Sequence, residues 1–237
     1  MKVCNIAFMK LNVLIASVAV LALLSCNTNN NRATKKPPST HSSQTKTSEG
    51  LNKTPSVDKR GAKAYLADSL PLTAILLNGH KPIMSYSSFQ KYYPKPDSTN
   101  KTLWECGSPF DSLDKNWMVT TYGPYDAQAG TFKNYDSQVT TIYVNGSAYA
   151  TNGHITLLIK ADAKRNAVLI PSHQIALSSH TSIATFNKLF PKTHPEKTDD
   201  KSIVRYRIPL KHKYDDAFLF YFKDGKFDHI ELWYLLC

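Results

Sequence analysis

Residues 182–192 read SIATFNKLFPK, and residues 85–95 read SYSSFQKYYPK. The two stretches share a serine, a phenylalanine, a lysine and a closing Pro-Lys at an offset of 97. Their apolar positions coincide at i, i+3, i+6 and i+7, which is the stripe of a short amphipathic helix. Ser85 and Ser182 are natural N-caps, and each helix should end at its proline because the residue before proline avoids the α region.

A short apolar stretch precedes each predicted helix. Residues 74–77 read AILL and residues 167–170 read AVLI, at an offset of 93, so a loop of about four extra residues separates the two registers. We interpret the region 65–237 as globular, with two tandem copies of a strand–helix–strands unit at about 70–163 and 164–237. Coincidence between short apolar stretches is the alternative, since many registers could match.

Downstream of each helix the pattern predicts antiparallel strands. Residues 202–210 alternate, and Asp224-Gly225 lies between two β-rich runs, which is a strong hairpin signal because a type I′ turn needs positive φ at both central residues. Asn-Gly pairs supply further turns in the first copy. The remaining predicted strands are 117–122, 139–144, 154–160, 217–222 and 227–236.

The expected fold class is α+β, an antiparallel sheet with few short helices on one face. This architecture resembles the tandem periplasmic and secreted modules typified by the beta-lactamase-inhibitor fold and by small outer-membrane-assembly lipoproteins. No specific motif of those families is matched, so their partners are not carried over, and fold alone does not fix function.

The N-terminus reads as a secretion signal. Lys2 and Lys10 precede a nearly continuous apolar run that is too short to span a bilayer. The run ends in Leu23-Leu24-Ser25-Cys26, which resembles the lipobox of bacterial lipoproteins. The resemblance implies a signal peptide over 1–25, cleavage before Cys26 and acylation of the Cys26 thiol. An ordinary signal peptide or a buried N-terminal helix is the alternative, and Met9 could be the true start.

The same resemblance implies a location and a first partner. Asn27 follows the cysteine, where aspartate would retain a lipoprotein in the inner membrane, so the outer membrane is expected. No acidic residue occurs before Glu49, which favours the periplasmic side. The lipid bilayer is then a partner through the acylated Cys26, because several acyl chains anchor a protein stably.

Residues 26–64 should be a lipidated cysteine followed by a disordered basic tether, because Leu51 and Val57 are its only large apolar residues after Cys26. The chain carries +11 in total, of which the signal contributes +2, the tether +6 and residues 65–237 only +3. The positive charge is therefore concentrated beside the membrane, and the folded part makes no case for a nucleic-acid partner.

No motif indicates catalysis, a cofactor or a metal. The eight histidines are scattered, and no HExxH, GxSxG, P-loop or GxGxxG sequence occurs.

Of the four cysteines, Cys106 and Cys237 remain after the one in the signal peptide and the lipid site Cys26 are set aside. Outside the cytoplasm they are candidates for a disulfide, with two unpaired cysteines as the alternative.

Aromatic residues are the remaining candidates for a binding site, since exposed Tyr and Trp anchor many protein and glycan interfaces. We expect Trp117, Tyr143 and Trp233 to be core. The loop 122–136, punctuated by glycine and proline, enlarges the first copy and is where a site should lie. The candidate binding residues in and around it are Trp104, Tyr122, Tyr125 and Tyr135.

Three functions are compatible with these features. The first is a lipid-anchored, non-catalytic envelope protein that binds a protein or glycan. The second is an envelope hydrolase, which a cleft joining His154, His173 or His180 to aspartates would favour. The third is a structural or assembly subunit of an envelope complex.

Replacing the lipid site tests the anchor directly. We expect Cys26→Ser to lose the lipid mass and to leave the membrane pellet, because the thiol is the acylated group. Mass spectrometry and fractionation of the variant measure this. A processed Cys26→Ser protein that still pellets with membranes would place the anchor elsewhere.

Overall fold

The computed structural model describes residues 61–104, 107–211 and 215–235, which belong to one compact unit spanning Leu51–Cys237. The predicted α+β class is confirmed: these residues form four short α-helices and fourteen strands, and all their strand pairings are antiparallel. No helix in these ranges is long and apolar enough to cross a membrane. The predicted signal peptide, Cys26, Cys106 and Cys237 lie outside the described residues.

From the helices α1 and α4 onward, the two halves of the unit carry corresponding elements, except for one segment between β3 and β6, whereas the short elements before these helices differ in order. The first half contains 3₁₀ helix η1 (Leu72–Ala74), β1 (Leu76–Leu77), β2 (Ile83–Ser85), α1 (Tyr86–Tyr92), β3 (Ser98–Leu103), β6 (Gln138–Val144), β7 (Ser147–Thr151) and β8 (Ile155–Asp162). The second half contains β9 (Val168–Ile170), 3₁₀ helix η2 (Pro171–His173), β10 (Ile175–Leu177), α4 (Ile183–Leu189), β11 (Pro195–Lys197), β12 (Ile203–Pro209), β13 (Ala217–Lys223) and β14 (Lys226–Trp233).

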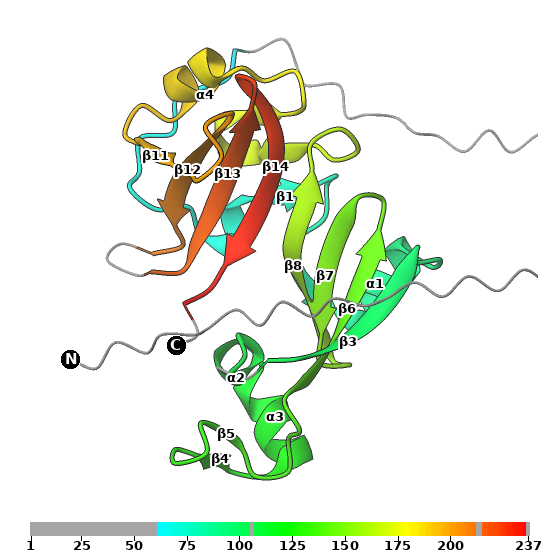
Figure 1. Ribbon diagram of the computed structural model, residues 1–237. Coiled ribbons are helices and arrows are strands. Elements are labelled where there is room, and N and C mark those ends of the chain that lie inside the picture. Colours follow the sequence, from blue (N-terminus) through cyan, green and yellow to red (C-terminus); the bar gives the residue numbers. More distant parts are fainter. Residues whose placement is uncertain (1–60, 105–106, 212–214, 236–237) are drawn as a thin grey trace, which may run out of the picture. The chain divides into compact units, whose positions relative to one another are not determined.

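One nine-stranded sheet joins the halves edge to edge (Figure 1). Its strand order is β11-β12-β13-β14-β8-β7-β6-β3, with β2 paired beside β8, so the order mirrors itself about the β14–β8 junction. A second sheet of order β1-β9-β10 combines one strand of the first half with two of the second. Each half therefore contributes strands to both sheets.

The two helices predicted from the sequence, α1 and α4, begin in the same way. The side chains of Ser85 and Ser182 each accept a hydrogen bond from the backbone N–H three residues later, at 3.2 Å and 3.1 Å, so the predicted N-caps are confirmed. The first helical residues, Tyr86 and Ile183, donate their N–H groups to the carbonyls just before β8 and β14. These bonds tie each helix to the last strand of its own half.

The helices pack their phenylalanines on one face of the large sheet. Phe89 of α1 contacts Tyr149 of β7 with ring centroids 4.9 Å apart. Phe186 of α4 is fully buried against three rings, Tyr206, Phe220 and Phe222. The three-stranded sheet covers the middle of the same face, where Leu77 and Val168 share a small apolar space with Phe218 and Ile230. This face is the hydrophobic core.

The hairpin turns predicted from Asp-Gly and Asn-Gly pairs are present in the structure. Asp224 and Gly225 have φ of 49° and 76°, and Asn145 and Gly146 have φ of 50° and 70°, as type I′ hairpins require. A Cβ on Gly146 would lie 1.8 Å from the Asp162 carboxylate, so a larger residue does not fit this turn.

Two sets of expectations were wrong. Residues 117–122 lie in helix α3 (Lys115–Tyr122), not in a strand. Their β-branched and aromatic content suggests a strand, but Gly123 with φ of 87° ends the helix by donating its N–H to Val119, and the helix buries Met118. Tyr143 is 42% exposed and not core, and Trp233 is half-buried, whereas Trp117 is half-buried and packs against the hydrophobic core.

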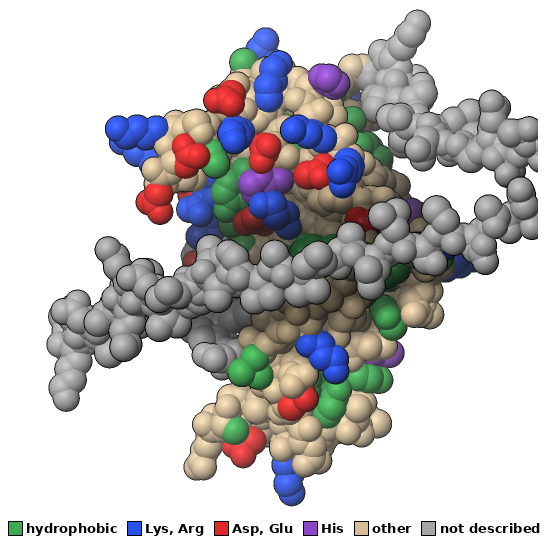
Figure 2. Space-filling view, turned by 45° about the vertical axis from the view of Figure 1, so that its right-hand side comes forward, with side chains coloured by type: hydrophobic (Ala, Val, Ile, Leu, Met, Phe, Trp, Pro, Cys, Tyr) green, Lys and Arg blue, Asp and Glu red, His purple; other side chains and the backbone are tan. Residues whose placement is uncertain are grey.

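The opposite face of the sheet carries charged side chains where the halves meet. The Glu231 carboxylate of β14 lies 3.2 Å from Lys160 Nζ of β8 and 3.3 Å from His229 Nε2. The Tyr221 ring stacks on His229 with centroids 4.2 Å apart. Basic and acidic side chains are interspersed over this part of the surface (Figure 2). Burial by itself raises the pKa of Glu231, but hydrogen bonds and positive charge from His229 and Lys160 outweigh it and hold the pKa at about 2.

The Glu231 interactions predict an acid-dependent stability. Because the pKa of Glu231 in the folded protein is about 2, below its ordinary 4.5, its contribution is fully present above about pH 4.5 and is lost as the pH falls toward 2. We expect Glu231→Gln to lower the free energy of unfolding at pH 7 by about 1–2 kcal/mol after solvent screening, and by much less at pH 2.

Urea unfolding across this pH range measures the effect. Asp68→Asn is the control, since Asp68 pairs with Lys192 on the exposed surface and should change stability by less than about 1 kcal/mol. A Glu231→Gln difference that is the same at pH 7 and pH 2 would contradict the proposed linkage.

Candidate functional site

The two halves differ by one large segment. Residues 104–137 separate β3 from β6, whereas residues 198–202 separate the corresponding strands β11 and β12. We call residues 104–137 the insertion. It contains α2 (Phe110–Leu113), α3, β4 (Tyr125–Asp126) and β5 (Thr131–Phe132), and β4 pairs with β5 as a short hairpin. Most of this segment has no counterpart in the second half.

A reciprocal hydrogen-bond pattern starts α2. The Asp111 carboxylate accepts a bond from the Ser108 backbone N–H at 3.2 Å, and the Ser108 hydroxyl accepts one from the Phe110 N–H at 3.1 Å. This is the logic of a capping box, with aspartate as the acidic member. Phe110 is fully buried and stacks on Trp104, with ring centroids 6.3 Å apart. The start of α2 is therefore held by both polar and apolar contacts.

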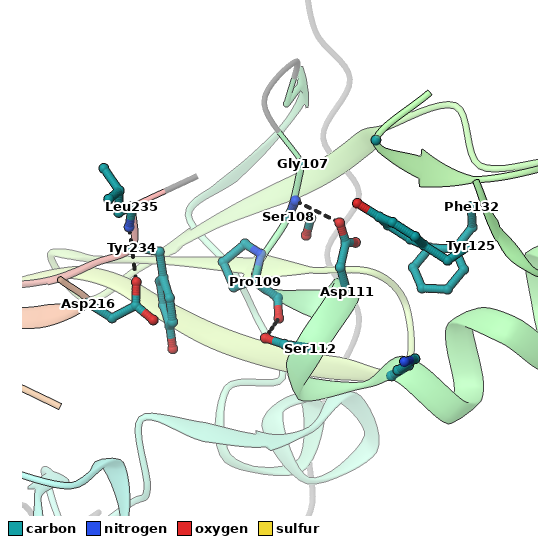
Figure 3. A pocket seen from close by; sticks show the side chains of 12 residues that line it. Gly107, Ser108, Pro109, Asp111, Ser112, Tyr125, Phe132, Asp216, Tyr234 and Leu235 are labelled. Atoms are coloured by element: carbon teal, nitrogen blue, oxygen red, sulfur yellow. Dashed lines mark hydrogen bonds between the residues drawn. The ribbon is translucent and has the colours of Figure 1, made fainter. Parts of the chain in front are cut away.

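A cavity of about 430 Å³ lies where the insertion meets the end of the second half. Figure 3 shows Pro109 and Asp111 between Tyr234 on one side and Tyr125 on the other. The Tyr125 ring extends from β4 with its hydroxyl toward Asp111, and it contacts Phe132 edge to face at 5.3 Å. The side chains that line the cavity include Asp111, Lys115, Tyr125, Asp216, Tyr234 and Leu235.

Two polar atoms of these lining residues are buried without a partner among the described residues. They are the second carboxylate oxygen of Asp111, Oδ1, and the Tyr234 hydroxyl. Burial raises the pKa of the Asp111 carboxyl. Burial, together with the negative charge of Asp216, raises the pKa of Tyr234. Buried polar atoms are usually hydrogen-bonded, so each unpaired one needs a reason.

The C-terminal wall of the cavity is held by Asp216. Its carboxylate accepts a hydrogen bond from the Leu235 backbone N–H at 3.0 Å, and its carbonyl accepts one from Leu210 at 2.8 Å. These bonds fix the segment after β14 beside the start of β13. Tyr234 and Leu235 are thereby presented to the insertion.

The structure places the four aromatic residues predicted to bind a partner in different environments. Tyr125 lines the cavity and is 47% exposed. Trp104 and Tyr122 are half-buried and pack against the hydrophobic core. Tyr135 is buried, contacts Tyr122, and donates its hydroxyl to the Gln138 carbonyl at 3.1 Å. Tyr125 is therefore the member of this set that faces the cavity.

Sequence reasoning missed Asp111 and Tyr234. A signal for Asp111 was present, because Ser108-Pro109-Phe110-Asp111 has the spacing of a capping box before an apolar residue. Tyr234 offered none, since its role depends on the place where β14 ends. Loop 122–136 forms only part of the insertion, and the cavity wall begins at Gly107.

One histidine does pair with an aspartate. His154 Nδ1 lies 2.9 Å from the Asp114 carboxylate, and its ring stacks on Trp117 at 5.0 Å with an interplanar angle of 7°. His173 instead contacts Tyr65, and His180 is exposed. An Asp–His pair is one part of hydrolytic machinery, but neither residue lines the cavity.

No family model, curated protein or solved structure matches this chain. Among the described residues, no group of three His, Cys, Asp or Glu side chains could hold a metal ion.

The disulfide between Cys106 and Cys237 stays a prediction. Gly107 and Leu235, which lie one and two positions from these cysteines, line the same cavity. We expect intact mass spectrometry without reductant to show a disulfide, and Cys237→Ser to lower stability by up to about 4–5 kcal/mol, since the bond would close a loop of about 130 residues. Two free thiols in the oxidised protein would refute the pairing.

Proposed function

We propose that this chain is a lipid-anchored protein of the bacterial cell envelope that binds a partner without catalysing a reaction. The observation that carries the proposal is the cavity between the insertion and the C-terminal segment. It combines aromatic walls with a few polar groups, including two buried atoms that have no hydrogen-bond partner within the part of the chain that the structure describes. Concave sites of this composition are typical of ligand recognition.

The anchoring half of the proposal is supported by sequence. The Leu23-Leu24-Ser25-Cys26 stretch resembles a lipobox, and the polar segment that follows fits a tether. Under this proposal the protein is held at the outer membrane, facing the periplasm, by acylated Cys26. The folded part would then sample partners near the membrane surface. Its binding partner is an envelope protein or glycan.

The internal correspondence of the halves supports a duplication. We propose that the two halves derive from one strand–helix–strands unit, because the helix caps, the strands that follow the helices and the mirrored sheet order correspond. The insertion is then an addition to one copy. A segment added to a stable scaffold is a natural carrier of function, as loops on rigid frameworks often are.

Two alternatives keep specific support. The Asp114–His154 pair favours an envelope hydrolase, because a carboxylate can orient an imidazole that acts as a general base. The exposed edge of β3, which among the described strands pairs only with β6, favours a structural subunit, since open edges can accept another strand. A purified full chain that turned over a cell-wall substrate, and lost turnover with His154→Ala, would replace binding by hydrolysis.

Photo-crosslinking tests the binding proposal. A benzophenone amino acid at position 125 should capture a discrete partner in the envelope, because Tyr125 lies at the cavity. The same probe at position 143 is the matched control, since Tyr143 is a tyrosine of similar exposure that does not line the cavity. Mass spectrometry identifies the captured species. Equal capture at both positions, or none at position 125, would count against this site.

A further inference from the structure

The Asp111 carboxylate indicates part of the ligand's chemistry, because it lines the cavity and its ionised form can only accept hydrogen bonds. Its Oδ1 is buried and has no partner among the described residues. The other oxygen of Asp111 is already occupied by the Ser108 N–H. The Tyr234 hydroxyl can donate or accept. A ligand that carries N–H donors would therefore suit the Asp111 carboxylate.

The charge of the lining favours a positive ligand. Asp111 and Asp216 contribute two carboxylates, and Lys115, which is exposed, is the one basic residue among the described lining residues. Burial raises the pKa of Asp111 and so opposes its ionised form in the empty cavity. A cation beside it would offset that cost. The aromatic faces of Tyr125 and Tyr234 add a second attraction for ammonium or guanidinium groups.

Exposed apolar residues occur in the cavity lining and elsewhere on or beside the insertion. Leu235 and Tyr125 line the cavity, and Leu113 follows the lining residue Ser112; all three are among the exposed large hydrophobic residues. Val119 and Leu103 lie on or beside the same insertion and are also exposed. Exposed apolar side chains in a cavity that also holds carboxylates match the surface of a protein partner better than that of a sugar.

We propose that the cavity receives the side chain of a lysine or arginine from a partner protein, with Asp111 as the counter-ion and apolar residues packed around the opening. This inference rests on the proposed binding function and names the chemistry of its partner. Arginine and lysine meet carboxylates through short, charge-assisted hydrogen bonds.

Short peptides test this chemistry on the full mature chain. The probes are acetyl-Leu-Lys-Leu-amide and the same peptide with norleucine, which keeps the aliphatic chain without the charge. Affinities are measured by NMR titration. We expect the lysine peptide to bind at least about tenfold more tightly, because a hydrogen bond to a charged group is worth a decade or more in affinity. Equal affinities would overturn the inference.

A charge-neutral variant isolates the role of Asp111. Asp111→Asn keeps an oxygen to accept the Ser108 N–H, so α2 retains its start. It should reduce the preference for the lysine peptide to about threefold or less. Asp136→Asn is the matched control, because Asp136 is an exposed carboxylate of the same insertion outside the cavity. If folded Asp111→Asn kept the full preference for the lysine peptide over the norleucine peptide, Asp111 would be excluded as the counter-ion. If the variant did not fold, the comparison of the two peptides on the wild-type protein would still test the inference.

Three further outcomes separate this inference from the binding function. Glucosamine that bound more tightly than the lysine peptide, while N-acetylglucosamine did not, would assign the cation to a sugar. A crosslink from position 125 to the protein's own residues 27–60 would make the basic occupant internal. Either result would overturn the inference that a partner protein's lysine or arginine occupies the cavity. Specific crosslinking at position 125 combined with equal peptide affinities would retain the binding function and reject the cation.

Discussion

The antiparallel pairing of β8 with β14 is the constraint on which the rest of the structure depends. It joins the halves through three residue pairs, which include Ala161 with Ile230 and Lys160 with Glu231. Ala161 and Ile230 face the core, whereas Lys160 and Glu231 form an ion pair on the other face. Because strands alternate with a period of two, a slip by one residue would bury the charges and expose the isoleucine. Packing and charge therefore select the same register.

This junction also places the candidate site. With β14 fixed against β8, the segment after β14 ends beside the start of β13, where Asp216 holds Leu235. The insertion of the first half supplies the other wall, including Asp111 and Tyr125. The cavity thus forms between a segment that only one half contains and the terminus of the other half. Two of its polar atoms, Asp111 Oδ1 and the Tyr234 hydroxyl, have no hydrogen-bond partner among the described residues.

Local signals predicted the elements that depend on nearby residues. The serine caps of α1 and α4 bond to N–H groups three residues away, and the Asp224-Gly225 turn needs only its own backbone angles. Helix α3 was missed because its β-prone residues carry little helical preference of their own. Burial of Met118, and the Asp114–Asn152 hydrogen bond that joins its start to the β7–β8 turn, are tertiary contacts.

The sequence by itself determined the α+β class, the capped helices and the hairpins of this protein, since those follow from capping, periodicity and turn chemistry over a few residues. Only the tertiary structure decided which aromatic residues face solvent. Tyr125 and Tyr135 lie ten positions apart in the same segment, yet the first lines the cavity and the second is buried. The cavity itself unites Asp111 with Tyr234, more than a hundred residues away, and no local pattern encodes a contact that depends on how two halves of a sheet meet.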